Sequence, residues 1–361
     1  MQLTNRFVYN KDEWNQILLQ LCGNQILQSW EWGEFKSCYD WTPQRIIWCD
    51  GGDCKAAAQI LTRNRTFLGI NFKIMYVPRG PILDWNDNHL IEIVLNDLRD
   101  LAIYEDAVFV KVDPYVTVGR SIYSYDQVDL DSIGHIVTQQ LEQNGWQKSN
   151  QQIQFRNTMI LDLDIDTNDL LLSFSQKTRY NIRLATRKGL VVRNGTIKEL
   201  DSLYDLYKLT SNRNGFAIRS RSYYVDLWKS LIQSGMAQSL IVEFDGELVG
   251  AVVLSIFGGC ATYMYGMSSG SHTEKMPNYL LQWEAILKAI ELECNLYDFW
   301  GVPDLFVEDD PLWGVWRFKS GFRGEVIYTT GAWDFVYKWL LYWLYTNIVP
   351  RIFSYIRMRN S

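Results

Sequence analysis

Hydrophobic positions along residues 54–113 change period twice, and the changes predict strands, a helix and a further strand. Two β-like runs, Ala56–Thr62 and Phe72–Val77, come first. Apolar residues then recur at helical spacing through Asn88–Tyr104,. A short apolar run, Ala107–Val112, follows and stops at Asp113 and a proline. The stretch therefore predicts a small α/β unit.

Residues 238–303 repeat this order. The predicted elements are strands Ser239–Phe244, Leu248–Phe257 and Cys260–Met267, a helix that opens at Pro277, and a closing strand Leu296–Trp300,. Two copies of one order indicate a duplicated unit. The predicted fold class is α/β (α+β), with mixed sheets flanked by helices. The order resembles the GNAT acyltransferase fold.

A helical, basic stretch lies between the copies at residues 164–189, and a helical pair follows at 197–212 and 221–234. Arg179, Arg183 and Arg187 are spaced i, i+4, i+8, so they share one helix face,. That face is either solvated or a contact for phosphate groups.

The tail, residues 333–361, is rich in aromatic side chains, and its basic residues outnumber its single acidic one, Asp334. The basic residues are Lys338, Arg351, Arg357 and Arg359. The apolar run 340–349 is too short to span a bilayer, which needs roughly 20 residues. Two interpretations stand: peripheral contact with an anionic membrane surface, or a C-terminal helix docked on the first domain.

Composition limits the number of domains and the classes of partner and cofactor that we expect. The chain has 361 residues, 47% of them hydrophobic, which suggests roughly two domains,. The net charge of −6 means that a nucleic-acid partner must meet a local basic patch,. The six cysteines form no CxxC pair and there are three histidines, so we expect no metal and no cofactor,. Residues 1–10 lack the apolar core of a signal peptide, so we expect a cytoplasmic protein,.

Lys319 is an unusual residue in its sequence context. It follows Phe318 and stands among aromatic and glycine residues. It is either an exposed lysine beside a turn, or an ammonium in a dry site where it stabilises a developing negative charge.

Seven segments, in this order along the chain, carry a more specific resemblance. They are Leu27–Lys36, Tyr76–Pro81, Lys177–Arg183 with Lys188–Val192, Gly215–Phe216 with Arg219 and Tyr223, Tyr263–Gly266, Pro277–Glu284 running to Tyr297–Gly301, and Phe318–Phe322. Together they resemble the FemABX family, the aminoacyltransferases that build peptidoglycan interpeptide bridges.

The resemblance implies two GNAT-like domains, residues 1–155 plus 318–361 and residues 156–317. Some members carry a long coiled-coil arm for tRNA contact, but residues 164–240 contain no charged heptad pair of that length, so either the shorter architecture applies or tRNA docks differently. It implies an aminoacyl-tRNA donor and a peptidoglycan precursor as acceptor, either UDP-MurNAc-pentapeptide or lipid II. A stem-peptide amine attacks the ester carbonyl, an amide forms and tRNA leaves. The protein would work in the cytoplasm or at the inner face of the plasma membrane.

The resemblance also assigns residues. Lys319 would stabilise the oxyanion or hold the tRNA end, and Phe318 would stack on a base or ribose. Asp113 would accept the amine's proton, unless it merely caps the turn before Pro114. The substrate-binding residues would be Lys36 and Arg219 on the diphosphate, with Tyr223, Tyr263, Tyr265, Trp32, Tyr76 and Arg79. Arg179, Arg183 and Arg187 would contact tRNA. Strand packing is the alternative for Tyr263 and Tyr265, because residues two apart share a strand face.

Two other functions stay open. The turn at residues 268–276 has one glycine and no R/Q-x-x-G-x-G/A pattern, which disfavours a CoA-dependent N-acyltransferase acting on a polysaccharide or amino-sugar precursor,. The other alternative is a catalytically silent, membrane-associated scaffold.

Overall fold

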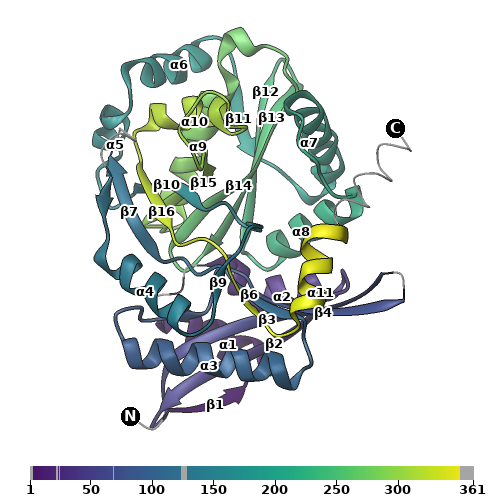
Figure 1. The fold of residues 1–361 in the computed structure, drawn as a ribbon. Helices are drawn as coiled ribbons and strands as arrows, with labels where there is room; N and C mark the ends of the chain where they lie inside the picture. Colours follow the sequence, from purple (N-terminus) through teal and green to yellow (C-terminus); the bar gives the residue numbers. More distant parts are fainter. Residues whose placement is uncertain (1–2, 22, 24, 68, 123–127, 350–361) are drawn as a thin grey trace. The chain divides into compact units, whose positions relative to one another are not determined.

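The computed structural model describes residues 3–21, 23, 25–67, 69–122 and 128–349. Arg351, Arg357 and Arg359 of the predicted tail lie outside these residues. The chain divides into two compact units, one of residues 1–119, 130–156 and 329–361, the other of residues 120–129 and 157–328. Each contains one mixed sheet with helices packed against it (Figure 1).

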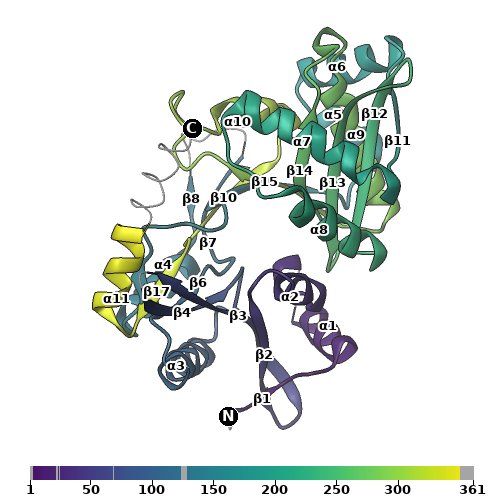
Figure 2. The ribbon, with the colours of Figure 1, turned by 90° about the vertical axis from the view of Figure 1, so that its right-hand side faces the viewer.

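The sheet of the first unit has the order β1-β2-β3-β4-β6-β17-β9, with β5 paired to β3. Its strands are β1 (Leu3–Phe7), β2 (Thr42–Asp50), β3 (Asp53–Phe67), β4 (Ile70–Val77), β5 (Ile82–Leu83), β6 (Phe109–Val112), β9 (Gln147–Lys148) and β17 (Trp333–Val336). Helices α3 (Asn88–Tyr104) and α4 (Ser132–Gln143) bury their apolar stripes on one face. Helices α1 (Lys11–Gln20) and α2 (Trp30–Ser37) lie on the other side of β2 and β3 from α3 (Figure 2).

The sheet of the second unit has the order β11-β12-β13-β14-β15-β10-β16-β7-β8. Its strands are β7 (Thr117–Ile122), β8 (Asp129–Leu130), β10 (Asn157–Asp162), β11 (Val191–Asn194), β12 (Ala237–Phe244), β13 (Glu247–Phe257), β14 (Cys260–Ser268), β15 (Leu296–Val302) and β16 (Glu325–Thr329). One face packs on α5 (Thr167–Ser173), α6 (Gln176–Arg187), α9 (Pro277–Glu291) and α10 (Trp313–Lys319). Helices α7 (Leu200–Asn214) and α8 (Arg221–Gln233) contact β14 and β12.

The predicted duplication is confirmed. Strands β2, β3 and β4 are antiparallel neighbours, α3 follows, and β6 returns parallel to β4. Strands β12, β13 and β14, helix α9 and the parallel strand β15 repeat that order. The helix predicted for Asn88–Tyr104 has those bounds in the structure. Asp87 begins it, because the Asp87 carboxylate accepts two of the backbone N–H groups that the first turn leaves without a helical partner,.

Two expectations differ from the structure, and one element was not expected. The stretch 164–189 is two helices, since the chain is extended at Phe174 and Ser175 between α5 and α6. Residues 318–328 belong to the second unit and not to the first, because Phe322 is buried in the second core and β16 pairs with β10. The aromatic tail begins with the buried strand β17 at residues 333–336, an element that the sequence did not predict.

The described part of the tail docks on the first unit. After β17 the chain forms α11 (Trp339–Trp343) and one π-helical segment, Leu344–Ile348. Leu341, Tyr342, Leu344 and Tyr345 pack against a cluster that includes Phe72 and Phe109. This is the docked arrangement that the sequence left as one of two interpretations. No helix among the described residues is both long and apolar enough to cross a membrane.

Candidate active site

Lys319 is the most unusual side chain of the second unit, because it is a lysine that is only 4% exposed. It is the last residue of α10, and its Nζ donates to the carbonyl oxygen of Gly301 at 2.7 Å and, at 3.4 Å, to that of Trp300. The structure therefore excludes the interpretation of Lys319 as an exposed lysine beside a turn. Phe318, its neighbour, is half-buried against Tyr279 and Phe322, with ring centroids 5.1 and 5.4 Å away.

Burial has a large effect on the ammonium of Lys319. Removal from water lowers the pKa of Lys319 from 10.5 to about 7, although the nearby Asp298 acts in the opposite direction,. Asp298 is itself buried and accepts hydrogen bonds from the Thr158 hydroxyl and the Trp300 backbone N–H. A lysine with this pKa exists in both protonation states near neutral pH, so it can stabilise a negative charge or take up a proton.

The strands around Lys319 diverge. The parallel pairing of β14 with β15 covers residues 260–262 and 296–298 and ends there. Beyond this point Lys319 Nζ lies 5.7 Å from the ring centroid of Tyr263 on β14, while it bonds to Gly301 on β15. The ammonium thus lies where two neighbouring strands have separated. Gly266 fits the same arrangement, since a Cβ there would meet the Tyr263 hydroxyl at 1.8 Å.

Tyr263 and Tyr265 do not share a strand face. Tyr263 pairs with Leu254 and Tyr265 with Val253, so Met264 is an extra residue that forms a bulge,. Consecutive residues of β13 point to opposite faces, and so do the two tyrosines paired with them. The shared face expected from their spacing is therefore wrong. Tyr263 packs against the core under α9, and Tyr265 contacts residues of α7 and α8.

An aromatic cluster surrounds Tyr265, and sequence patterns alone did not single it out. Its members Tyr207, Tyr224, Trp228 and Tyr265 lie with ring centroids 5.1 to 6.1 Å apart. The Arg219 guanidinium adjoins it, 4.7 Å from the ring centroid of Tyr223. Burial raises the pKa of Tyr223, an effect that the charge of Arg219 opposes. Arg219, Tyr223 and Tyr265 are therefore neighbours, as their predicted shared role requires.

Asp113 begins a buried hydrogen-bond network in the first unit. It follows β6 directly, and its carboxylate accepts bonds from the Tyr76 hydroxyl at 2.7 Å and from the Arg79 backbone N–H. Burial raises the pKa of Asp113 from 3.8 to about 6, against the opposing charge of Arg79. The Arg79 guanidinium donates to the Phe155 carbonyl at 2.7 Å. The structure thus brings Asp113, Tyr76 and Arg79 together.

Lys36 lies in an aromatic setting in the same unit. Its side chain is buried in the last turn of α2, with Nζ 5.9 Å from the ring centroid of Trp32 and 5.6 Å from that of Trp41. Trp41 in turn lies 6.5 Å from Tyr76. Trp41 therefore connects the predicted residues Trp32 and Lys36 to the Asp113 network. No sequence motif identified Trp41.

The three arginines of α6 have different surroundings. Arg183 and Arg187 are exposed, whereas Arg179 donates to the carbonyl oxygens of Leu172 and Phe174 at 2.7 and 2.5 Å. These bonds satisfy carbonyl groups at the end of α5. Arg179 therefore has a structural role within the unit, and Arg183 and Arg187 remain the candidates for a phosphate contact.

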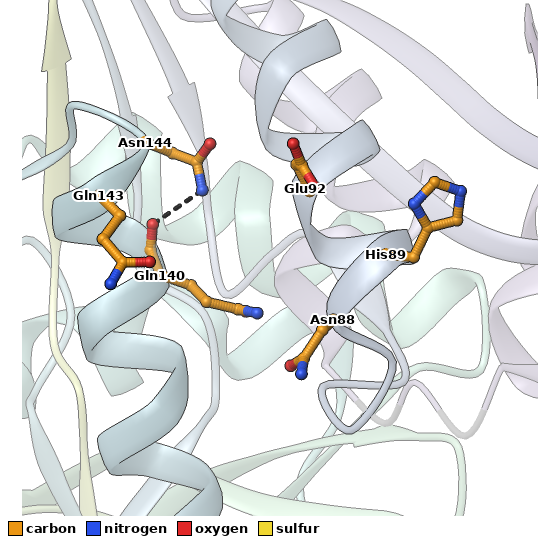
Figure 3. A pocket seen from close by; sticks show the side chains of 6 residues that line it. All are labelled: Asn88, His89, Glu92, Gln140, Gln143 and Asn144. Atoms are coloured by element: carbon orange, nitrogen blue, oxygen red, sulfur yellow. Dashed lines mark hydrogen bonds between the residues drawn. The ribbon is translucent and has the colours of Figure 1, made fainter.

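A hollow of about 430 Å³ lies between α3 and α4 of the first unit, lined by polar side chains (Figure 3). These are Asn88, His89, Glu92, Gln140, Gln143 and Asn144. None of the predicted site residues lines it. In the part of the chain that the structure describes, no three His, Cys, Asp or Glu side chains come together as a metal site.

Comparison with known proteins places the chain in a family. The sequence profile of the FemAB family matches residues 13–236 and 233–349, so the chain belongs to that family. It is 24% identical to the lipid II:glycine glycyltransferase of Staphylococcus haemolyticus in an alignment that covers 91% of each protein. To the lipid II:glycine glycyltransferase of Staphylococcus aureus it is 23% identical, and the alignment again covers 91% of each.

The fold comparison agrees. The crystal structure of FemX superimposes with a TM-score of 0.81 at 22% identity, over 95% of this chain and 99% of that one. A tandem GNAT protein from the clavulanic acid biosynthesis pathway gives a TM-score of 0.55 at 13% identity, over 92% and 98%. The two mixed sheets thus have the predicted GNAT-like fold.

Proposed function

We propose that this protein is an aminoacyltransferase that adds an amino acid to the stem peptide of a peptidoglycan precursor, with aminoacyl-tRNA as donor. Membership of the FemAB family supports the reaction class, and the names of the staphylococcal relatives support a lipid II acceptor. The observation that carries the proposal is Lys319, a buried ammonium whose pKa is about 7 at the point where β14 and β15 separate.

The chemistry fits such a group. The neutral amine of the acceptor attacks the ester carbonyl carbon of the donor, a C–N bond forms, and the carbonyl oxygen takes the negative charge. Collapse of this intermediate breaks the C–O bond, and the tRNA hydroxyl leaves with a proton. An ammonium in a dry site stabilises the oxyanion far better than one in water. Phe318, beside it, offers an aromatic face to a base or ribose.

Binding the acceptor requires cations for its diphosphate and an apolar surface for its peptide. Lys36 in the first unit lies near the rings of Trp32 and Trp41, and Arg219 in the second lies near the ring of Tyr223, contacts that help to orient a cation,. Each unit thus contributes one cation suited to phosphate, and we assign Arg219 to the diphosphate in the second unit and Lys36 to a phosphate contact in the first. Arg183 and Arg187 are assigned to tRNA.

The test is a transfer assay with the purified full chain. Glycyl-tRNA and lipid II in detergent are the first substrates, UDP-MurNAc-pentapeptide replaces lipid II in a second arm, and mass spectrometry detects the added residue. We expect an amide product that depends on charged tRNA. Product formed equally well from acetyl-CoA would instead identify a CoA-dependent N-acyltransferase. A full set of charged tRNAs without any product on either acceptor would refute the proposal.

The tRNA assignment has its own control within α6. Replacing Arg183 and Arg187 together by Gln should raise the KM for aminoacyl-tRNA about tenfold or more and leave the KM for the acceptor unchanged. Replacing Arg179 by Gln should lower thermal stability, because two carbonyl groups lose their donor,. An unchanged KM for tRNA in the double variant would remove α6 from the tRNA contact.

A further inference from the structure

The outward face of α11 carries a group of exposed apolar side chains. Leu341, Tyr342 and Tyr345 point inward and pack on the sheet cluster. Trp339 and Leu340 remain 62% and 73% exposed, and Trp343, one turn after Trp339, is 52% exposed. We call these three exposed residues the α11 patch. Single exposed apolar side chains are ordinary, but two tryptophans and a leucine on one short helix are not.

The charged residues of the sequence from residue 337 onward are all basic. From residue 337 to the C-terminus the sequence contains Lys338, Arg351, Arg357 and Arg359 and no acidic residue. The whole chain has a net charge of −6, so this end differs in sign from the rest. Lys338 is held near the helix by an ion pair with Asp106 at 2.6 Å. A segment of this composition attracts a partner with a negative surface.

We propose that the α11 patch docks on the surface of an anionic phospholipid bilayer. Tryptophan is the side chain most enriched at the level of lipid headgroups, because its ring is apolar and its N–H finds polar partners there. A short helix with an apolar face and flanking arginines lies in that interface without crossing it. A second copy of the chain is a poorer occupant, because pairing two such ends would bring like charges together.

The proposal concerns a surface other than the candidate active site and would stand if the proposed reaction failed. If both hold, docking brings the enzyme to an acceptor that is itself anchored by a lipid. Transfer to the lipid-linked precursor in vesicles would then depend on the α11 patch, while transfer to the soluble nucleotide-linked precursor would not.

The test measures co-sedimentation of the full chain with vesicles of phosphatidylcholine alone and with vesicles that also contain phosphatidylglycerol. We expect binding to the anionic vesicles. Replacing Trp339 and Trp343 by Ser should weaken it roughly tenfold or more. The matched control is Tyr104→Ser, which removes an aromatic side chain that is 85% exposed at the end of α3 and should change nothing. Circular dichroism melting checks that each variant is folded.

A second variant separates charge from apolar insertion. Replacing Arg351, Arg357 and Arg359 by Gln should reduce binding to anionic vesicles on the order of a hundredfold at low salt, and high salt should reduce wild-type binding likewise. Three results would overturn the proposal. They are no binding of the wild type to anionic vesicles, equal binding of the wild type and the tryptophan variant, and a dimer in solution that Leu340→Ser dissociates.

Discussion

Replacing Lys319 by Met tests the assignment on which the proposed reaction depends. Methionine has a similar length and no charge, so it should fill the buried space that Lys319 occupies. The pKa of Lys319 falls from 10.5 to about 7 on folding, so keeping this side chain charged in the folded protein costs roughly 5 kcal/mol,. The variant loses the hydrogen bonds that Lys319 Nζ donates to the carbonyl oxygens of Trp300 and Gly301, which costs about 1–3 kcal/mol,. We therefore expect the variant to fold and to melt no lower than wild type at neutral pH.

Turnover, unlike thermal stability, should fall in this variant. One group that stabilises an oxyanion contributes about a hundredfold or more to the rate, so we expect Lys319→Met to lower kcat at least about tenfold. The KM for the acceptor should change little, because Lys319 is assigned to the intermediate and not to the ground state.

The pH dependence distinguishes a charged Lys319 from a neutral one. The ratio of the wild-type rate to the Lys319→Met rate cancels the titration of the acceptor amine, which both enzymes share. If the ammonium is the active form, this ratio is highest below pH 7 and falls as the pH rises through about 7,. In Lys319→Arg, which stays charged, the corresponding ratio should be flat across this range.

Stability gives an independent check of the same pKa. Between pH 7 and 10.5 the unfolded chain keeps a proton on Lys319 that the folded protein has lost. The free energy of unfolding contributed by this group therefore rises with pH across that window and is lowest below pH 7. Urea unfolding should show this slope in wild type and a smaller one in Lys319→Met. A rate ratio that rises with pH would refute the charged role, and an unchanged turnover would remove Lys319 from the reaction.

Three further predictions concern the other site residues. Asp113→Asn should raise stability in urea unfolding above pH 6 but not near pH 4, because burial opposes only the ionised form of Asp113, and equal effects at both pH values would contradict this,. Arg219→Ala should raise the KM for the acceptor about tenfold, and Arg219→Lys should restore less than half of the loss if guanidinium geometry matters. Gly266→Ala should displace Tyr263, whose hydroxyl would lie 1.8 Å from the new Cβ, and should cost about 1–3 kcal/mol in thermal unfolding while lowering kcat,.

The elements that the sequence predicted well are those whose period is long and whose ends carry local signals. Helix α3 is 17 residues long, with an apolar stripe and an aspartate cap, and its predicted bounds were right to the residue. The break between α5 and α6 was missed because a single extended turn at Phe174 leaves the charge pattern unchanged. The predicted boundary at 317/318 was displaced because Phe322 packs into the second core, a contact over long sequence distance that periodicity does not reveal.

Contacts between residues distant in sequence also limited the prediction of the site. Lys319 was noticed because a lysine among aromatic residues conflicts with its local pattern, but its burial depends on the divergence of two strands distant in sequence. Trp41 was missed because one tryptophan in an aromatic-rich chain is not distinctive. The bulge at Met264, which separates the faces of Tyr263 and Tyr265, leaves no trace in a run of aromatic residues.

The two units have the same strand order, but the equivalent parallel strands pair over different lengths. In the first unit β4 and β6 pair from Ile74↔Phe109 to Val77↔Val112, and the hydrogen bond from Tyr76 to Asp113 continues the contact beyond the last pair. In the second unit the equivalent strands separate after three pairs, so backbone carbonyl groups near Gly301 are available to a side chain. Those carbonyl groups accept hydrogen bonds from the buried lysine, and the charge of the nearby Asp298 also favours its ammonium form. In a site without water, an ammonium interacts strongly with a negative charge that develops nearby. The open pair of strands is therefore the structural requirement for the chemistry proposed at Lys319.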